Sequence, residues 1–225
     1  MLLHLVEKLE KKMKELSIKC KERDMWFMKT ESKFVFTHIE YCKMDPSLNN
    51  DFLITLKRNY YIYKYLENSV KQCTSGDILC AGISYGTSAM IASELVDTNL
   101  YGKKWLFMDP MSGDGKPKGH YNTSEELILE RWKQRSPLQF IKKYLNSETS
   151  KSLPSLCFAH LNTGDMKVEL DSIHNVLEKI ESNGCIIWDN YGRQSIDFYK
   201  DNQPSTLENC TTIALDTRQL LIIKD

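Results

Sequence analysis

The chain has 225 residues, and its 30 basic and 30 acidic side chains give a formal net charge of zero at neutral pH. This length suits a single domain with a substantial core, and the balanced charge gives no reason to expect nucleic acid or a membrane surface as a partner. No apolar stretch approaches the roughly 20 residues that a membrane-spanning helix needs. We therefore expect a globular protein with no nucleic-acid partner and no membrane span.

Apolar residues recur at helical spacing near the N-terminus, at Leu2, Leu5, Leu9, Met13 and Leu16. Charged residues interrupt this segment throughout, which argues against a signal peptide. We expect an amphipathic helix that packs on its own domain or on the mate in a homodimer. A helix that binds a membrane surface or another partner is the alternative.

Seven cysteines are scattered along the chain without the CxxC spacing of a zinc site. Several lie inside apolar runs, as buried free cysteines do. An odd number of scattered cysteines predicts a reducing compartment, so we expect a cytoplasmic protein.

Predicted helices and strands alternate after residue 50. The first part comprises a helix in "LITLKRNYYIYKYLENSV", a strand in "GDILCAG", a helix in "TSAMIASELV", a strand in "KKWLFMD", a loop in "MSGDGKPKGHYN", a helix in "SEELILERWKQR" and a short strand in "LQFIKK". The second part comprises a strand in "SLCFAHL", a helix in "DSIHNVLEKIESNG" that stops at Gly184, a strand in "CIIWDN", and an antiparallel hairpin of "TTIAL" and "QLLII".

This alternation predicts an α/β sandwich with a mostly parallel sheet and a C-terminal antiparallel hairpin. We treat residues 1–225 as one domain. Residues 1–70 form an N-terminal helical region, and residues 71–225 form the α/β core. The segments "FVFTHIEYC" and "GKPKGHYN" are candidates for a lid over the site.

Ligands of such sheets bind beyond the carboxyl ends of the strands, which directs attention to "ILCAGISYGTSAMIASE" at 78–94. Gly82 and Gly86 bracket a strand-to-helix turn, where glycine lets a ligand approach the backbone and the helix N-terminus offers N–H groups. Asp109 ends the next strand and is suited to accept both hydroxyls of a ribose. The pattern predicts a nucleoside ligand, although G-x-x-x-G is not the dinucleotide fingerprint. A packing turn and a loop-capping Asp109 are the structural alternatives.

Four segments also carry a family resemblance. "CAGISYGTS" is similar to E-C-G-V-x-x-G-G-S, "DPMSGDGKP" to D-S-F-x-G-x-P, and "FIKKYLNSET" to F-I-K-G-x-x-x-x-T. The stretch "AHLNTGDMKVELDSIHNVLEKIESNGCIIWDNYG" is similar to L-H-I-D-x-D-L-Y, a helix, and G-G-x-I-x-x-D-D-Y-G. From about Tyr60 onward the chain thus resembles the class I S-adenosylmethionine-dependent methyltransferases, specifically the macrocin O-methyltransferase (TylF/MycF-like) family, which methylates sugar hydroxyls.

The resemblance implies a Rossmann-like fold, S-adenosyl-L-methionine as cofactor, and a small sugar or sugar-containing acceptor. It implies cofactor contacts along the glycine turn and at the end of the second strand: Ala81, Gly82, Ser84, Tyr85, Gly86, Thr87, Ser88 and Asp109. Cys80 replaces an acid of the family that meets the amino-acid part of the cofactor, so we expect that contact to be weakened or moved.

In the family, a divalent cation held by the first Asp of D-x-D and by D-D orients the acceptor, and the second Asp of D-x-D is a candidate base. Carried onto this chain, the base is Asp165 and the metal ligands are Thr163, Asp189 and Asn190, with Asn162 as the alternative to Thr163. Oxygen donors suit Mg²⁺ or Ca²⁺. Because Thr163 stands where the family has an aspartate, one carboxylate ligand is lost, and we expect weak binding of Mg²⁺.

Each of these roles has an alternative. Asp165 is also suited to cap a helix, and Asp189 with Asn190 to form a strand-end turn. His38 and His120, expected in loops, are alternative bases. At the level of function, the alternatives are a cofactor-binding protein without turnover and a nicotinamide-dependent oxidoreductase.

Overall fold

The structure is a computed structural model. It describes residues 11, 22–83, 86–110, 125–132, 136–189, 207 and 210–225. The described chain separates into two compact units, Met1–Tyr60 and Tyr61–Asp225, which divide inside helix α4 (Phe52–Gln72). The amphipathic helix expected near the N-terminus lies outside the described residues, apart from Lys11.

The N-terminal unit contains α2 (Glu22–Thr30), α3 (Ser32–Cys42), the 3₁₀ helix η1 (Pro46–Asn49) and the first part of α4. Phe34 packs edge-on against Tyr60, with ring centroids 5.4 Å apart. His38, expected in a loop, lies instead in α3, and its side chain is fully buried. Apolar residues recur at helical spacing around it, and helix formation buries them.

The second unit is built on a seven-stranded sheet of order β3-β2-β1-β4-β5-β7-β6. The strands are β1 (Asp77–Ala81), β2 (Trp105–Met108), β3 (Leu138–Ile141), β4 (Leu156–Leu161), β5 (Ile180–Trp188), β6 (Cys210–Ala214) and β7 (Leu220–Lys224). The pairs from β3 to β5 are parallel, and β7 is antiparallel to both β5 and β6. The predicted fold class is therefore confirmed, and the strand order reverses between β1 and β4.

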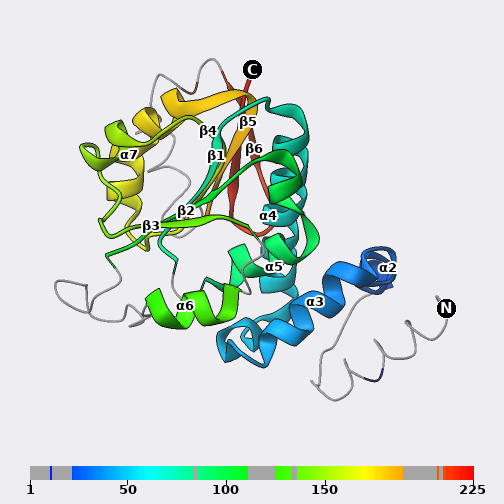
Figure 1. The fold of residues 1–225 in the computed structure, drawn as a ribbon. Helices are drawn as coiled ribbons and strands as arrows, with labels where there is room; N and C mark the ends of the chain where they lie inside the picture. Colours follow the sequence, from blue (N-terminus) through cyan, green and yellow to red (C-terminus); the bar gives the residue numbers. More distant parts are fainter. Residues whose placement is uncertain are drawn as a thin grey trace. The chain divides into compact units, whose positions relative to one another are not determined.

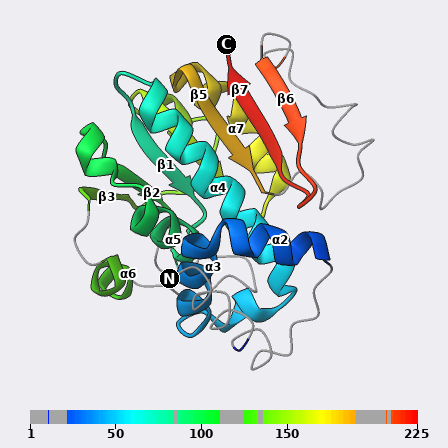
Figure 2. The same ribbon diagram turned by 90° about the vertical axis from the view of Figure 1, so that its right-hand side faces the viewer.

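Helices cover both faces of this sheet. α7 (Met166–Lys179) lies on one face, while α5 (Thr87–Leu95) and the later part of α4 lie on the other, as the two views in Figures 1 and 2 show. The remaining helices of the unit are α6 (Glu125–Trp132) and the 3₁₀ helices η2 (Thr98–Tyr101) and η3 (Thr149–Ser152). Since both faces are covered, the central strands are apolar throughout rather than alternating with polar residues.

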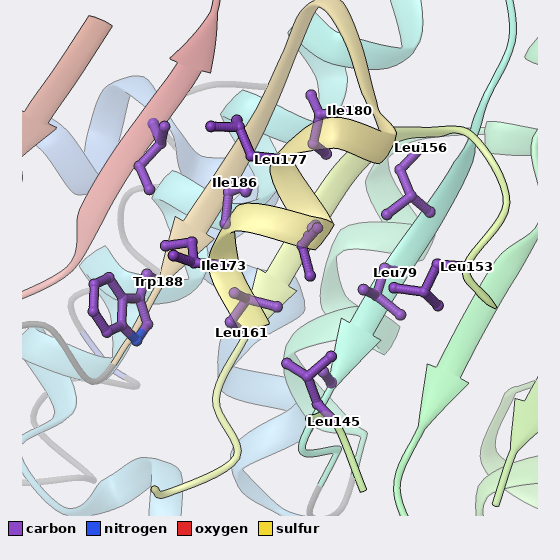
Figure 3. Close-up of a cluster of buried hydrophobic side chains, with 14 of the residues drawn as sticks. Leu79, Leu145, Leu153, Leu156, Leu161, Ile173, Leu177, Ile180, Ile186 and Trp188 are labelled. Carbon is purple, nitrogen blue, oxygen red and sulfur yellow. The ribbon is translucent and has the colours of Figure 1, made fainter. Parts of the chain in front are cut away.

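The core under α7 is a continuous apolar cluster (Figure 3). Ile173 and Leu177 of α7 pack in one cluster with Leu79, Leu161 and Ile186 of the strands. On the opposite face, Trp132 of α6 packs against Trp105 and Phe107, with ring centroids 5.3 and 5.2 Å apart. These layers hold the carboxyl ends of the parallel strands at one edge.

The helix expected at 171–184 differs from α7 at both ends. α7 begins at Met166, because Asp165 caps it, and it ends at Lys179, where β5 starts. Gly184 is therefore a strand residue and not a helix stop. A Cβ at this position would lie 2.6 Å from the carbonyl oxygen of Cys157, so the close approach of β4 requires glycine.

Among the described residues, no helix combines the length and the apolar character needed to cross a membrane.

Candidate functional site

The carboxyl ends of the parallel strands form a continuous edge. Backbone hydrogen bonds continue beyond the strands: Gly82 N–H donates to Met108 O, Asn162 N–H to Ala81 O, and Asp189 N–H to Leu161 O, at 2.9–3.0 Å. The segments that follow β1, β4 and β5 are therefore neighbours. The sequence predicted most of its candidate residues in these segments.

The glycine turn after β1 has the expected backbone geometry. Gly82 and Gly86 both adopt positive φ, +77° and +72°. A Cβ on Gly82 would lie 2.1 Å from the carbonyl oxygen of Asn162, so the segment after β4 occupies the space that a side chain would need. The structure thus gives a packing reason for Gly82, while ligand approach to its backbone stays a prediction. Ser84 and Tyr85 lie outside the described residues.

Asp109 lies against this turn. Its Oδ2 accepts a hydrogen bond of 3.2 Å from the backbone N–H of Ile83, and its side chain is partly exposed. Gly86 is the N-cap of α5, so Thr87 and Ser88 form the first turn of a helix whose N-terminus favours anions and hydrogen-bond acceptors. The structure therefore brings Asp109 to the glycine turn, and its contact with a ribose stays a prediction.

Asp165 is the N-cap of α7. Its Oδ1 accepts hydrogen bonds from Lys167 N–H at 3.0 Å and Val168 N–H at 3.2 Å. The side chain is exposed. The capping function is thus present in the structure, and no described hydrogen bond engages Oδ2. Whether this carboxylate also acts as a base stays a prediction.

Thr163 is held by a residue that the sequence analysis did not single out. Its backbone N–H and its hydroxyl both donate to Oε1 of Glu169, the hydroxyl at 2.8 Å. Oε2 of Glu169 accepts from the indole Nε1–H of Trp188, and the glutamate is fully buried. One signal was available: Glu169 precedes Ile173 and Val176 at helical spacing, so an acidic residue lies on the apolar stripe of α7.

Asp189 belongs to a second buried polar group. Nε2 of His160 lies 3.0 Å from Asp189 Oδ2, outside regular hydrogen-bond geometry. Gln219 Nε2–H donates to Asp189 Oδ1, and the Thr217 hydroxyl donates to Gln219 Oε1 at 2.6 Å. Gln219 and Thr217 come from the hairpin turn, which no sequence motif connects to the end of β5. Asn190 lies outside the described residues.

The proposed cation ligands are engaged with protein groups. Thr163 donates its hydroxyl to Glu169, and Asp189 accepts from Gln219. Within the described ranges, no group of at least three His, Cys, Asp or Glu side chains is arranged to hold a metal ion. The side chains of Thr163 and Asp189 therefore do not form a preformed cation site. The third predicted ligand, Asn190, lies outside the described residues, so the prediction of Mg²⁺ stays untested there.

The described cysteines are free thiols, and most of them are buried. Cys80 is buried in β1, and burial raises the pKa of its thiol, so the chain carries a neutral core side chain where the family it resembles has an acid. Burial also raises the pKa values of Cys157 and Cys185 to about 12. Of the six cysteines in the described part of the chain, none forms a disulfide.

No protein-family model and no curated protein matches the chain. Solved structures do match it. The O-methyltransferase NovP aligns with a TM-score of 0.56 at 15% identity, over 76% of this chain and 81% of that chain. CalS11, described as a calicheamicin methyltransferase, aligns with a TM-score of 0.54 at 10% identity, over 86% and 92% of the two chains.

The chain has the class I methyltransferase fold. A second structure of CalS11, the apo form, is described as a TDP-rhamnose 3'-O-methyltransferase and aligns equally well, with a TM-score of 0.54 at 10% identity over 86% and 94% of the chains. At these identities the likeness establishes the fold alone. The narrower resemblance to the macrocin O-methyltransferases remains a prediction.

Proposed function

We propose that this protein is an S-adenosyl-L-methionine-dependent O-methyltransferase that acts on a hydroxyl of a sugar or sugar-containing acceptor. The observation that carries the proposal is the contact between Asp109 and the glycine turn at Ile83, on the edge of the sheet where class I methyltransferase folds carry their cofactor. The similar structures of NovP and CalS11 support O-methylation, and CalS11 supports a sugar acceptor.

The protein's part in cofactor binding follows from this geometry. The bond from Ile83 N–H holds the Asp109 carboxylate beside the glycine turn, and this carboxylate is the proposed acceptor for the ribose hydroxyls. The first turn of α5, with Thr87 and Ser88, follows the same glycine turn and contributes helix N-terminal N–H groups. The bound cofactor would supply the methyl group on its sulfonium. Cys80 is a buried apolar side chain, so other residues must hold the amino-acid part of the cofactor.

Methyl transfer to a hydroxyl requires alignment and removal of a proton. Asp165 is the proposed base: Oδ1 holds the helix N-terminus, and Oδ2 is the oxygen that would receive the proton. The two cap bonds fix the orientation of this carboxylate at the N-terminus of α7.

No step of this mechanism runs through a metal, because the described side chains of Thr163 and Asp189 have protein partners. The weak Mg²⁺ site expected from the sequence is tested by chelation, where a fall in activity that excess Mg²⁺ reverses would support it. Full activity after exhaustive chelation would remove the cation from the proposal and leave Asp165 alone as the base.

The activity is tested by methyl transfer from radiolabelled S-adenosyl-L-methionine to a panel of nucleotide-sugars, with catechol as the non-sugar acceptor. We expect label in at least one sugar product. Cofactor binding without transfer to any acceptor would favour the binding protein without turnover. Binding of NAD in place of S-adenosylhomocysteine would favour the oxidoreductase.

A further inference from the structure

A buried carboxylate connects two segments of the candidate site. Glu169, in the first turn of α7, has no exposed surface, yet both of its oxygens accept hydrogen bonds. The donors are the backbone N–H and hydroxyl of Thr163, after β4, and the indole N–H of Trp188, at the end of β5. We call these three residues the Glu169 bridge.

Burying an acidic side chain is costly unless hydrogen bonds replace its hydration. A packing role alone would be served better by an apolar residue on this stripe of α7, where Ile173 and Val176 follow. The three donors come from two segments that are distant from each other in sequence. The carboxylate therefore satisfies polar groups of two segments at once and fixes the distance between them.

The segments joined by the bridge border the proposed chemistry. Thr163 Oγ1 accepts a hydrogen bond from Asp165 N–H at 3.3 Å, which orients the residue that carries the proposed base. On its other side, the backbone of Asn162 and Thr163 packs against Gly82 in the glycine turn. Trp188 directly precedes Asp189.

We propose that Glu169 is a positioning residue, which holds residues 162–165 so that Asp165 lies at a fixed place beside the cofactor turn. This inference rests on the proposed function for its catalytic consequence, but the bridge itself is testable without any activity. Glu169 acts through Thr163 and does not itself meet the substrate.

Glu169→Gln tests the bridge with little change in size. A glutamine has one acceptor oxygen and one donating amide group, so its NH₂ must face either the Thr163 donors or the Trp188 indole N–H. One of the two segments then loses its hydrogen bond. We expect amide exchange at Thr163 or indole exchange at Trp188 to become about tenfold faster or more, on the scale of losing a bond to a charged group.

Trp188→Phe is the second substitution of a double-mutant cycle with Glu169→Gln. It removes the indole donor, so in the double variant the glutamine NH₂ meets no opposing N–H and its oxygen remains available to Thr163. The double variant should show slower exchange at Thr163 than the two single variants predict together. Glu178→Gln, at an exposed glutamate of the same helix, controls for the change in helix charge.

Both readouts come from NMR, and turnover is measured in parallel. In Glu169→Gln we expect kcat to fall about tenfold while the KM for the cofactor changes less than threefold, and the double variant should recover part of kcat. Unchanged exchange at both Thr163 and Trp188 would overturn the bridge. If Glu169→Gln speeds exchange at Thr163, strict additivity of the two substitutions at that residue would also overturn it.

The two proposals fail in different ways. If the parent protein transfers no methyl group, the proposed function fails, and the exchange rates alone then decide whether Glu169 fixes residues 162–165. If exchange becomes faster but kcat and KM both stay at parent values, the bridge exists but the positioning role is refuted.

Discussion

The backbone N–H of Ile83 donates a hydrogen bond of 3.2 Å to Oδ2 of Asp109. This bond ties the glycine turn after β1 to the end of β2. It places the carboxylate that the sequence assigns to a ribose beside the turn that the sequence assigns to the same ligand. Two predictions made from separate segments are therefore found at one place in the fold.

Gly82→Ala should destabilise the protein strongly. A Cβ would lie 2.1 Å from the carbonyl oxygen of Asn162, in addition to the cost of positive φ, and we expect a loss on the order of 3 kcal/mol in urea unfolding. Gly102→Ala is the matched control, because Gly102 has φ +65° with nothing within 4 Å of a Cβ. Equal losses in the two variants would show that Asn162 does not restrict the turn. A bulky residue at Gly82 is consequently a poor test of cofactor binding.

Acid should weaken the protein through His38. Burial lowers the pKa of His38 to about 3, so this histidine stays neutral in the folded protein while the unfolded chain takes up a proton below pH 6.5. The unfolded state then binds more protons, and stability falls as the pH drops from 6.5 toward 3. At pH 4.5 the free energy of unfolding should be about 2 kcal/mol lower than at pH 6.5.

Urea unfolding at several pH values measures this effect. His38→Gln keeps an acceptor for the Asn59 side chain, which lies 3.3 Å from His38 Nδ1, and should flatten the stability profile between pH 6.5 and 4.5. His174→Gln, at an exposed histidine of α7, is the matched control. The same slope in both variants would mean that His38 is not the titrating group.

Asp165→Asn separates the base from the cap. Asparagine caps helices about as well as aspartate, so the free energy of unfolding should change by less than about 1 kcal/mol. Turnover should fall about a hundredfold, the scale of losing a general base. Asp171→Asn, on the same helix, controls for the lost charge. A stable Asp165→Asn protein with near-normal turnover would place the base elsewhere.

Thr163→Asp should be destabilising in the absence of divalent cations. The Thr163 hydroxyl lies 2.8 Å from a carboxylate oxygen of Glu169, so an introduced carboxylate would face a buried one. We expect a loss on the order of 2 kcal/mol relative to Thr163→Ser, which keeps the hydroxyl. Melting is compared in EDTA and in excess Mg²⁺. Equal stability of the two variants in EDTA would show that Glu169 does not contact residue 163 as described.

Local sequence patterns predicted the sheet and most of its helices, because apolar runs and glycine turns are short-range signals. They failed at 180–184. Ile180 continues the apolar spacing of α7, but it belongs to β5 because this segment pairs with β4. They also failed at His38, which was expected in a loop but lies buried in α3.

The candidate site was predictable only where a residue follows a strand. Asp109 and Asp165 were identified as candidates in this way, and their roles stay predictions. Glu169 and Gln219 were missed because their partners, Trp188 and Asp189, are brought to them by the folding of distant segments. A hydrogen bond between side chains that are far apart in the sequence produces no recognisable residue spacing.

The most direct test of the central claim is calorimetric titration of S-adenosylhomocysteine into the parent protein and into Asp109→Asn. The asparagine oxygen can still accept from Ile83 N–H, but asparagine lacks the negative charge and the second acceptor oxygen of the carboxylate. We predict binding to the parent, with affinity at least about tenfold weaker in Asp109→Asn. Asp97→Asn, at a capping aspartate of η2, should bind as the parent does. No binding to the parent, or equal binding to Asp109→Asn, would contradict the account.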